Sequence, residues 1–266
     1  MMQKSQQQQQ KPILKTAEQI AKMREAGKLV AEALHIARTL AVPGTRTLDI
    51  DQAIDALFSK HTAEPLFKGY PGKRPFPAST CICLNEQVVH GIPGPRVLRP
   101  GDLLKVDTAC KLDGFCADAA ICVPIGDTVR PDILKLVKTA EEALAIAIRE
   151  VGKRKRWSEV SVQMQQHVEK AGFSIVERFV GHGIGRSMHE APQVPNYSNR
   201  EMREVDFDIV PGLVLAIEPM VNFGKKDVQE LPDQWTVITR DRLPSAHVEH
   251  TVAITEDGVQ ILTARS

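Results

Sequence analysis

An internal repeat limits the fold more than any other feature of this sequence. The segments 100–107 and 211–218 share the form P-G-x-x-L-x-[VI]-[DE] at an offset of 111 residues, and the helix openings at Asp49 and Glu159 are 110 residues apart. Because helix, helix and strand recur in one order, we predict two similar α+β halves, each ending a strand on an acidic side chain. A site shared between the halves is expected, since clefts form where subdomains meet.

The composition is that of an ordinary globular chain and argues against two classes of protein. A length of 266 residues predicts one or two domains. With 34 basic and 33 acidic side chains the net charge is +1, whereas nucleic-acid binding needs a basic surplus. No apolar run approaches the ~20 residues of a bilayer span. We therefore expect no specific nucleic-acid partner and no membrane partner.

The cysteines and the N-terminal segment indicate in which cellular compartment the protein is expected. Five cysteines are an odd number without a C-x-x-C pair, which argues against a disulfide framework and favours a reducing compartment. The first twelve residues have no apolar core, unlike a signal peptide, and their glutamine run cannot bury enough apolar surface to fold. We expect a cytoplasmic protein with a disordered Gln-rich tail over residues 1–12 and a single catalytic domain over residues 13–266.

Capping signals and apolar periodicity predict helices over residues 16–40, 47–60, 133–151 and 157–170. Three prolines and two glycines predict a long irregular loop over residues 66–78, and residues 80–84 are rich in β-formers. Asp113-Gly114 is a tight-turn signal, so residues 103–124 are expected to form a hairpin.

Two aspartates flank this predicted turn. If the turn has two residues, Asp118 faces Ala109, which lies two residues from Asp107 on the same side of its strand. The two carboxylates are then diagonal neighbours with backbones roughly 7–8 Å apart, close enough to share metal ions. An acidic pair on a solvent-facing hairpin is the alternative.

Further acidic and imidazole groups favour a metal site. Glu218 ends an apolar run, and a buried carboxylate must be paired or metal-bound. Glu249 lies in a β-rich stretch that would also suit a half-exposed edge strand. Gly181–Glu190 is rich in glycine and predicts a loop carrying His182 and His189, each of which alone also fits a packed or solvated residue. Four carboxylates and one imidazole in one cleft would form the ligand set of a hydrolytic two-metal centre.

Six motifs in order along nearly the whole chain resemble type I methionine aminopeptidases: Asn85–Pro93, Asp107, Asp113–Asp118, Gly181–Pro192, Ile217–Met220 and Ser245–Thr251. The resemblance implies the pita-bread fold, an α+β arrangement of two pseudo-symmetric halves around an antiparallel sheet with a dinuclear metal site between them. The implied metal ligands are Asp107, Asp118, His182, Glu218 and Glu249. It also implies that His90 and His189 contact the substrate during catalysis and that Glu218 takes up a proton.

The same resemblance implies a hydrolase that removes the N-terminal methionine of nascent proteins when the second residue is small. The implied cofactors are two divalent ions (Co, Mn, Fe, Zn or Ni) and a monovalent cation near Asn85, Gln87 and Ser245. The implied methionine pocket is lined by Phe67, Tyr70, Cys81, Met188 and Trp235. The expected partners are the N-termini of nascent polypeptides, with a transient ribosome contact, and we expect a monomer.

Other proteins of this fold match less well. The 31-residue interval from Glu218 to Glu249 leaves no room for the insertion of type II methionine aminopeptidases, and prolidases carry an additional N-terminal domain that this sequence lacks. Two alternatives stay open. One is a peptidase specific for X-Pro bonds. The other is a non-catalytic protein docking on ribosomes or RNA through Lys153–Arg156, a basic cluster that is also typical of a solvated turn.

The sequence departs from the family pattern at a few positions. Ala109 and Ala119 stand where the family often has threonine, and Met188 stands where it often has phenylalanine. The segment 73–78 resembles an insertion near the pocket. Loss of the two hydroxyls predicts a change in metal affinity or rate, because groups behind the ligands tune a metal site.

Overall fold

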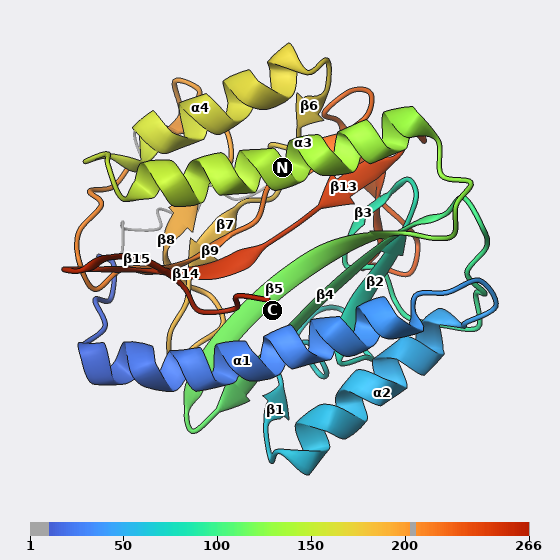
Figure 1. The fold of residues 1–266 in the computed structure, drawn as a ribbon, viewed down its shortest axis with the longest axis horizontal. Helices are drawn as coiled ribbons and strands as arrows, with labels where there is room; N and C mark the ends of the chain where they lie inside the picture. The colour runs from blue at the N-terminus through green and yellow to red at the C-terminus, as the bar shows by residue number, and fades with distance from the viewer. Residues whose placement is uncertain (1–10, 203–205, 266) are drawn as a thin grey trace.

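Two helix pairs lie on opposite sides of the strands in the computed structural model, which describes residues 11–202 and 206–265 (Figure 1). Most of the Gln-rich tail predicted over residues 1–12 lies outside the described residues. The helices begin and end within two residues of their predicted bounds. The first helix opens with the predicted capping box, in which the Gln19 amide donates to the Thr16 hydroxyl and the Thr16 amide to the Gln19 side chain.

The two halves repeat the order helix, helix, strands. The first half contains α1 (Ala17–Leu40), α2 (Thr47–Lys60), β1 (Glu64–Pro65), β2 (Thr80–Leu84), β3 (Gln87–Val89), β4 (Leu103–Leu112) and β5 (Phe115–Pro124). The second half contains α3 (Pro131–Val151), α4 (Trp157–Lys170), β6 (Ser174–Ile175), β7 (Gly181–Gly183), β8 (Glu190–Val194), β9 (Val214–Ile217), β10 (Met220–Asn222), β11 (Val228–Glu230), β12 (Val237–Thr239), β13 (Ser245–His247), β14 (His250–Thr255) and β15 (Gly258–Ile261).

Strand pairing within the described residues is antiparallel throughout. In the first half, β4 pairs with β1, β2 and β5, and in the second half five strands follow the order β15-β14-β9-β7-β8. A small sheet of order β11-β12-β3 joins strands from both halves. The repeat found in the sequence therefore places β4 and β9 at corresponding positions of the two halves. The prediction that each strand ends at the acidic residue is wrong for Asp107, which lies in the middle of β4 because the strand continues to the Asp113-Gly114 turn, whereas Glu218 directly follows β9.

Each helix pair has its own apolar core against the strands. The core of the first half gathers residues of α1 and α2 with β4 and β5 around Phe58 and Ile54. The core of the second half is built on α3 and α4 around Trp157, whose indole stacks on Phe207. The candidate site lies between these two cores, where β5 meets β14. No helix among the described residues is long and apolar enough to cross a bilayer.

Candidate metal centre and substrate pocket

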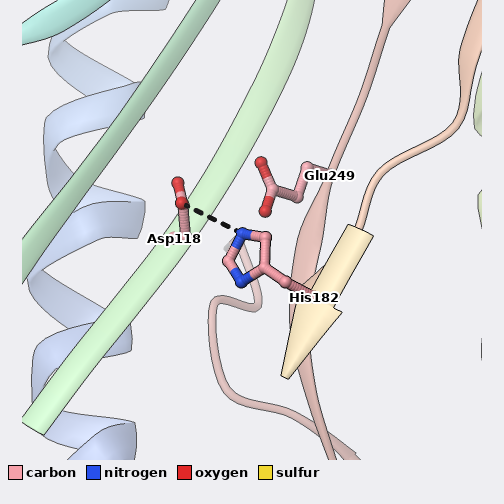
Figure 2. A group of neighbouring side chains, drawn as sticks. All are labelled: Asp118, His182 and Glu249. Atoms are coloured by element: carbon pink, nitrogen blue, oxygen red, sulfur yellow. Dashed lines mark ion pairs between the residues drawn. The ribbon is translucent and has the colours of Figure 1, made fainter. Parts of the chain in front are cut away.

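The structure brings all five predicted metal ligands together between the halves. Asp107 and Asp118 come from β4 and β5, His182 from β7, Glu218 from the residue after β9, and Glu249 from the bend between β13 and β14. Ligand atoms of Asp118, His182 and Glu249 lie within 4.8 Å of one another, and Figure 2 shows the imidazole pointing toward the two carboxylates. The Nε2 atom of His182 lies 3.7 Å from Glu218 Oε1.

The predicted hairpin register is confirmed and positions the two aspartates. Asp113 and Gly114 have φ values of 49° and 79°, as a two-residue turn of type I′ requires, and Leu112 pairs with Phe115. Asp118 therefore lies opposite Ala109, two residues from Asp107 on the same face of β4. The alternative of a solvent-facing acidic hairpin is wrong, because Asp118 is only 4% exposed.

A threonine of the second half holds the first-half hairpin in place. The Asp118 amide donates to the Thr251 hydroxyl at 3.0 Å, and that hydroxyl donates to the Asp118 carbonyl at 2.7 Å. The Glu249 amide donates to the Ala120 carbonyl at 3.0 Å. These bonds fix β5 against the start of β14. Glu249 is 2% exposed, so the reading of this stretch as a half-exposed edge strand is wrong.

The glycine-rich segment around His182 differs from the predicted loop. Gly181–Gly183 forms strand β7, and β8 begins at Glu190. A Cβ atom on Gly181 would collide with the Ala216 carbonyl oxygen, and one on Gly183 with the Ala191 carbonyl oxygen. The glycines are needed because neighbouring backbones approach closely, which is why a strand here looks like a turn in the sequence.

The hydrogen bonds of His182 select the nitrogen that faces the carboxylates. Its Nδ1 lies 3.0 Å from the Gly183 carbonyl, which can only accept, so Nδ1 carries the proton. Burial, followed by the neighbouring His189, lowers the pKa of His182 to about 3. The ring is therefore neutral, and the Nε2 lone pair points toward Asp118 and Glu218, as a metal ligand requires.

The carboxyl groups form a buried acidic cluster that no lysine or arginine of the described residues contacts through an ion pair. Among the described residues, no lysine or arginine nitrogen lies within 4.0 Å of Asp107, Asp118, Glu218 or Glu249 side chains. Buried oxygens of Asp107, Asp118 and Glu249 have no hydrogen-bond partner. Burial and mutual repulsion raise the pKa of Asp107, Glu218 and Glu249 well above the usual range, and burial raises that of Asp118 to about 7.

This donor set fits divalent metal ions. Unpartnered buried carboxylate oxygens are costly unless a cation binds them. Oxygen ligands with one imidazole nitrogen suit Mn²⁺, Fe²⁺, Co²⁺ or Zn²⁺ rather than a soft thiolate-binding ion. The residues present are therefore the ligands a hydrolytic metal centre needs.

Two further histidines predicted to contact substrate border this cluster. The ring centroid of His189 lies 4.4 Å from that of His182, and its Nδ1 lies 2.9 Å from the Tyr70 hydroxyl oxygen. His90 follows β3 with a φ of 58°, and its ring meets Phe179 edge-on at 5.4 Å. Burial, with a smaller effect of His189, lowers the pKa of His90 to about 4, so its imidazole is neutral.

The five residues predicted for the methionine pocket belong to one apolar cluster. Phe67, Cys81 and Met188 are buried in it, and Tyr70 and Trp235 pack against it. Cys81 pairs across strands with Asp107, and Ala109, also in the cluster, pairs with Asp118. Because cross-strand partners project on one face of a sheet, the apolar cluster and the carboxylates share a face.

Phe76 is a member of this cluster that the sequence reasoning missed. It is 3% exposed, and its ring lies 5.2 Å from the Trp235 ring and 6.5 Å from the Phe67 ring. It belongs to the segment 73–78, which the sequence marks as an insertion near the pocket. The only signal in the sequence was a phenylalanine inside that proline-rich insertion, and its burial is visible only in the fold.

The two alanines that depart from the family pattern lie on opposite faces of the sheet. Ala109 lies in the cluster beside the carboxylates, whereas Ala119 is buried in the core under α1 and α2. A hydroxyl at position 119 would point away from Asp118, because successive side chains alternate faces. The expected effect on metal affinity or rate stays a prediction for Ala109, and the position of Ala119 argues against a direct effect there.

The basic cluster considered for ribosome or RNA docking is paired with acidic side chains. Lys153 and Arg154 contact Glu150, and Arg156 contacts Asp206 and Asp208. The segment forms the turn between α3 and α4. Its charges are therefore largely balanced locally, which favours the solvated-turn interpretation.

Comparisons with known proteins agree with this arrangement. The chain matches the model of metallopeptidase family M24 over residues 21–256. Methionine aminopeptidase 1 of Bacillus subtilis (strain 168) is 43% identical over 253 residues, which cover 94% of this chain and 98% of the relative. The crystal structure of a methionine aminopeptidase from Thermotoga maritima matches with a TM-score of 0.90 and 38% identity, covering 96% of this chain and 100% of that chain.

A prolidase from Pyrococcus furiosus matches with a TM-score of 0.74 and 21% identity, which shows the fold alone, and the match covers 66% of the prolidase and 96% of this chain. These matches confirm the expected pita-bread fold of two α+β halves. Both the family model and the relatives of similar length extend over nearly the whole chain. The chain belongs to the methionine aminopeptidases of metallopeptidase family M24.

Proposed function

We propose that this hydrolase removes the N-terminal methionine from nascent proteins whose second residue is small. The observation that carries the proposal is the shared face of the hairpin, on which Asp107 and Asp118 adjoin an apolar cluster of aromatic and sulfur-bearing side chains. Glu218 and Glu249 of the second half complete a group of four carboxylates, and buried oxygens of three of them have no hydrogen-bond partner. The carboxylates suit hydrolytic metal chemistry, and the cluster suits a thioether side chain, because sulfur contacts aromatic rings favourably.

Asp107, Asp118, His182, Glu218 and Glu249 would hold two divalent ions. Four carboxylates with a neutral imidazole carry four negative charges, which two divalent ions balance and one does not. Divalent ions held there supply Lewis-acid activation of water and of the scissile carbonyl.

Glu218 is the proposed proton acceptor. Its side chain is 14% exposed, more than that of Asp118, so it borders the space open to substrate. A carboxylate there can accept a proton from the attacking water on one oxygen and return it to the departing amine. His247 Nε2 lies 3.5 Å from Glu218 Oε2, on the side away from His182.

His189 and His90 are the proposed substrate-contacting histidines. For a neutral His189 to donate from Nε2 to the developing oxyanion, its Nδ1 must be unprotonated, and the Tyr70 hydroxyl 2.9 Å away can donate a hydrogen bond to it. A hydrogen bond in that direction stabilises the Nε2-protonated tautomer of His189. His90, neutral and held edge-on by Phe179, would contact the scissile amide.

The proposed pocket supplies the specificity. Phe67, Tyr70, Cys81, Met188 and Trp235 would contact the methionine side chain. The two histidines would narrow the space beside the scissile bond, so that only small second residues such as Gly, Ala or Ser fit. We further propose that residues 13–266 act as a single catalytic domain and that the protein is a monomer.

The proposed setting is the cytoplasm, with newly made N-termini as substrates and transient contact with the ribosome. The five cysteines are all buried and unpaired in the structure, which is consistent with a reducing compartment. Binding to nascent N-termini does not require a basic surface for nucleic acid.

Methionine release tests the proposal directly. Protein stripped with a chelator should release no methionine from Met-Ala-Ser, and activity should return on adding Co²⁺, Mn²⁺ or Fe²⁺. Met-Lys-Ser should be a poor substrate, and Ala-Pro-Ser should not be cleaved. Full activity in metal-free protein would refute the metal mechanism, efficient cleavage of Met-Lys-Ser would refute the small-residue rule, and cleavage of Ala-Pro-Ser would favour the X-Pro peptidase instead.

A further inference from the structure

Lys105 is a buried lysine inside the sheet that carries the metal ligands. It is 1% exposed and lies on β4, on the same face as Asp107. Its cross-strand partners are Cys83 on β2 and Cys122 on β5. Burying an ammonium group is costly unless hydrogen-bond acceptors compensate its charge, so the groups that contact this lysine are informative.

The contacts of Lys105 are with a backbone carbonyl. Its Nζ donates to the Asn85 carbonyl oxygen at 2.8 Å. Among the described residues, no carboxylate lies within 4.0 Å of Nζ, although several lysines elsewhere form such pairs. The ammonium therefore contacts a carbonyl oxygen, as a small bound cation would, and does not form an ion pair with a carboxylate.

Asn85 is the junction of three segments. Its backbone has a φ of 52° in the turn from β2 to β3, and its side chain bonds Asp102 and the Leu103 amide at the start of β4. Its carbonyl also accepts the Ser245 amide of β13 at 3.0 Å. The carbonyl therefore ties β4, which carries Asp107, to β13, which precedes Glu249.

This junction is where the family resemblance implies a monovalent cation, and the residues present do not fit one. The two lone pairs of the Asn85 carbonyl are taken by Lys105 and Ser245. The Gln87 side-chain oxygen accepts the Leu84 amide at 2.7 Å, and the Ser245 hydroxyl donates to the Val221 carbonyl. A second positive charge beside the Lys105 ammonium would also be repelled.

We propose that the Lys105 ammonium is a built-in cation that replaces the monovalent metal ion, so that this protein needs neither potassium nor sodium. Lys105 is a positioning residue. By binding the Asn85 carbonyl, it holds the β2–β3 turn and β13 against β4. These contacts in turn position the backbone next to Asp107 and Glu249. The expectation of a bound monovalent cation near Asn85, Gln87 and Ser245 is replaced by this inference.

The test compares potassium responses of the full chain and three variants at constant ionic strength, with tetramethylammonium as the replacement ion. Lys105→Ser opens the position, Lys105→Met fills it without charge, and Lys138→Ser removes an exposed lysine of α3 as the matched control. Thermal unfolding of chelator-treated protein is one readout, and anomalous scattering from crystals soaked in rubidium is the second. Neither depends on the proposed function, whereas kcat/KM for Met-Ala-Ser, the third readout, rests on it.

The unmodified protein and Lys138→Ser should show the same Tm and kcat/KM in both salts and no rubidium beside Asn85. Lys105→Ser should gain roughly 5–10 °C in Tm at saturating potassium, recover kcat/KM, and bind rubidium there. Lys105→Met should show reduced kcat/KM without recovery. If Lys105→Ser does not fold, Lys105→Asn takes its place. A saturable potassium response or bound rubidium in the unmodified protein would overturn the proposal, as would a serine or asparagine variant indifferent to potassium.

Discussion

The position of the ring proton distinguishes the proposed roles of two neighbouring histidines, His182 as a metal ligand and His189 as a hydrogen-bond donor. His182 and His189 lie seven residues apart in sequence with ring centroids 4.4 Å apart, but different groups hold their Nδ1 atoms. The Gly183 carbonyl accepts from His182 and leaves its Nε2 free to bind a metal. The Tyr70 hydroxyl can donate to His189 and leave a proton on its Nε2. At the scale of the residue, the partner of each ring thus determines its role.

Alanine at each position should therefore have different effects. His189→Ala is expected to lower kcat about 10²–10³-fold with metal content unchanged, because it removes a donor used in the transition state. His182→Ala should lower metal occupancy and recover part of its activity in excess metal. Calorimetric metal titration alongside kcat distinguishes the two. The assignment would be reversed if His189→Ala lost metal and His182→Ala retained it.

Tyr70→Phe tests the tautomer argument. The variant keeps the aromatic ring in the pocket but cannot donate to His189, so kcat should fall about tenfold, the value of one hydrogen bond to a group that becomes charge-bearing. KM for Met-Ala-Ser should change little. Tyr197→Phe is the matched control, since the chain has two tyrosines and the Tyr197 hydroxyl bonds the Glu177 carbonyl instead. Equal effects of both substitutions on kcat would show that Tyr70 has only a packing role.

At the scale of the element, close backbone packing around β7 places His182. The glycines on either side of this histidine let β7 approach the backbones of β8 and β9. A side chain at Gly181 or Gly183 would have to displace a neighbouring carbonyl. The position of the His182 imidazole therefore depends on two glycines that take no part in the reaction.

Gly183→Ala should consequently destabilise the protein by about 1–3 kcal/mol and weaken metal binding, because the new methyl group collides with the Ala191 carbonyl. Gly94→Ala is the control, since a Cβ there meets nothing within 4 Å. Urea unfolding and metal titration of both variants provide the measurement. A Gly183→Ala variant as stable and as metal-competent as Gly94→Ala would contradict the packing argument.

The elements that the sequence predicted well are those fixed by local signals. The capping box at Thr16 and the turn at Asp113-Gly114 each act over a few residues, and the hairpin register around Asp118 followed from the turn alone. β7 was missed because its glycines are required by close contacts with β8 and β9, which a local sequence pattern does not show. Phe76 was missed for the same reason, since only the fold brings Trp235 and Phe67 to it. The four acidic residues were candidates from the strand and turn pattern, whereas the choice of His182 over His189 as the ligand came from the family resemblance.

At the scale of the whole molecule, the buried titratable groups make the stability of the metal-free protein depend on pH. Unfolded carboxyl groups ionise near pH 4, whereas burial keeps the pKa of Asp118 at about 7 and those of Asp107, Glu218 and Glu249 well above the usual range. These groups bind more protons in the native state, so their contribution to stability falls as pH rises.

The buried histidines act in the opposite direction below pH 6.5. His90, His182, His247 and His250 have pKa values lowered to about 3–4, so the unfolded state binds their protons and stability rises with pH up to about 6.5. Above that pH the histidine effect fades over about one pH unit, and the buried Lys105, whose pKa burial lowers to about 8, adds a rise of stability with pH. The difference between metal-free and metal-saturated protein therefore isolates the metal site.

Relative to the metal-saturated protein, the unfolding free energy of chelator-treated protein should fall by about 1.4 kcal/mol per pH unit for each carboxyl that is still protonated. Saturating metal should abolish the fall, because the ion replaces the protons. Urea unfolding at pH 6.5 and 7.5 with and without metal measures both effects. Asp118→Asn should flatten the slope of the metal-free protein, and a slope unchanged by metal or by this substitution would exclude the cluster as its source.

The division of the ligands between the halves has a consequence for how the enzyme could be taken apart. Asp107 and Asp118 come from the first half, and the other three ligands from the second. The exposed turn 126–128 between β5 and α3 is the only covalent connection between them. If that turn were cut, neither piece would carry enough ligands for hydrolysis. Turnover would then depend on the concentration of the pieces, as for two subunits, and would report their association.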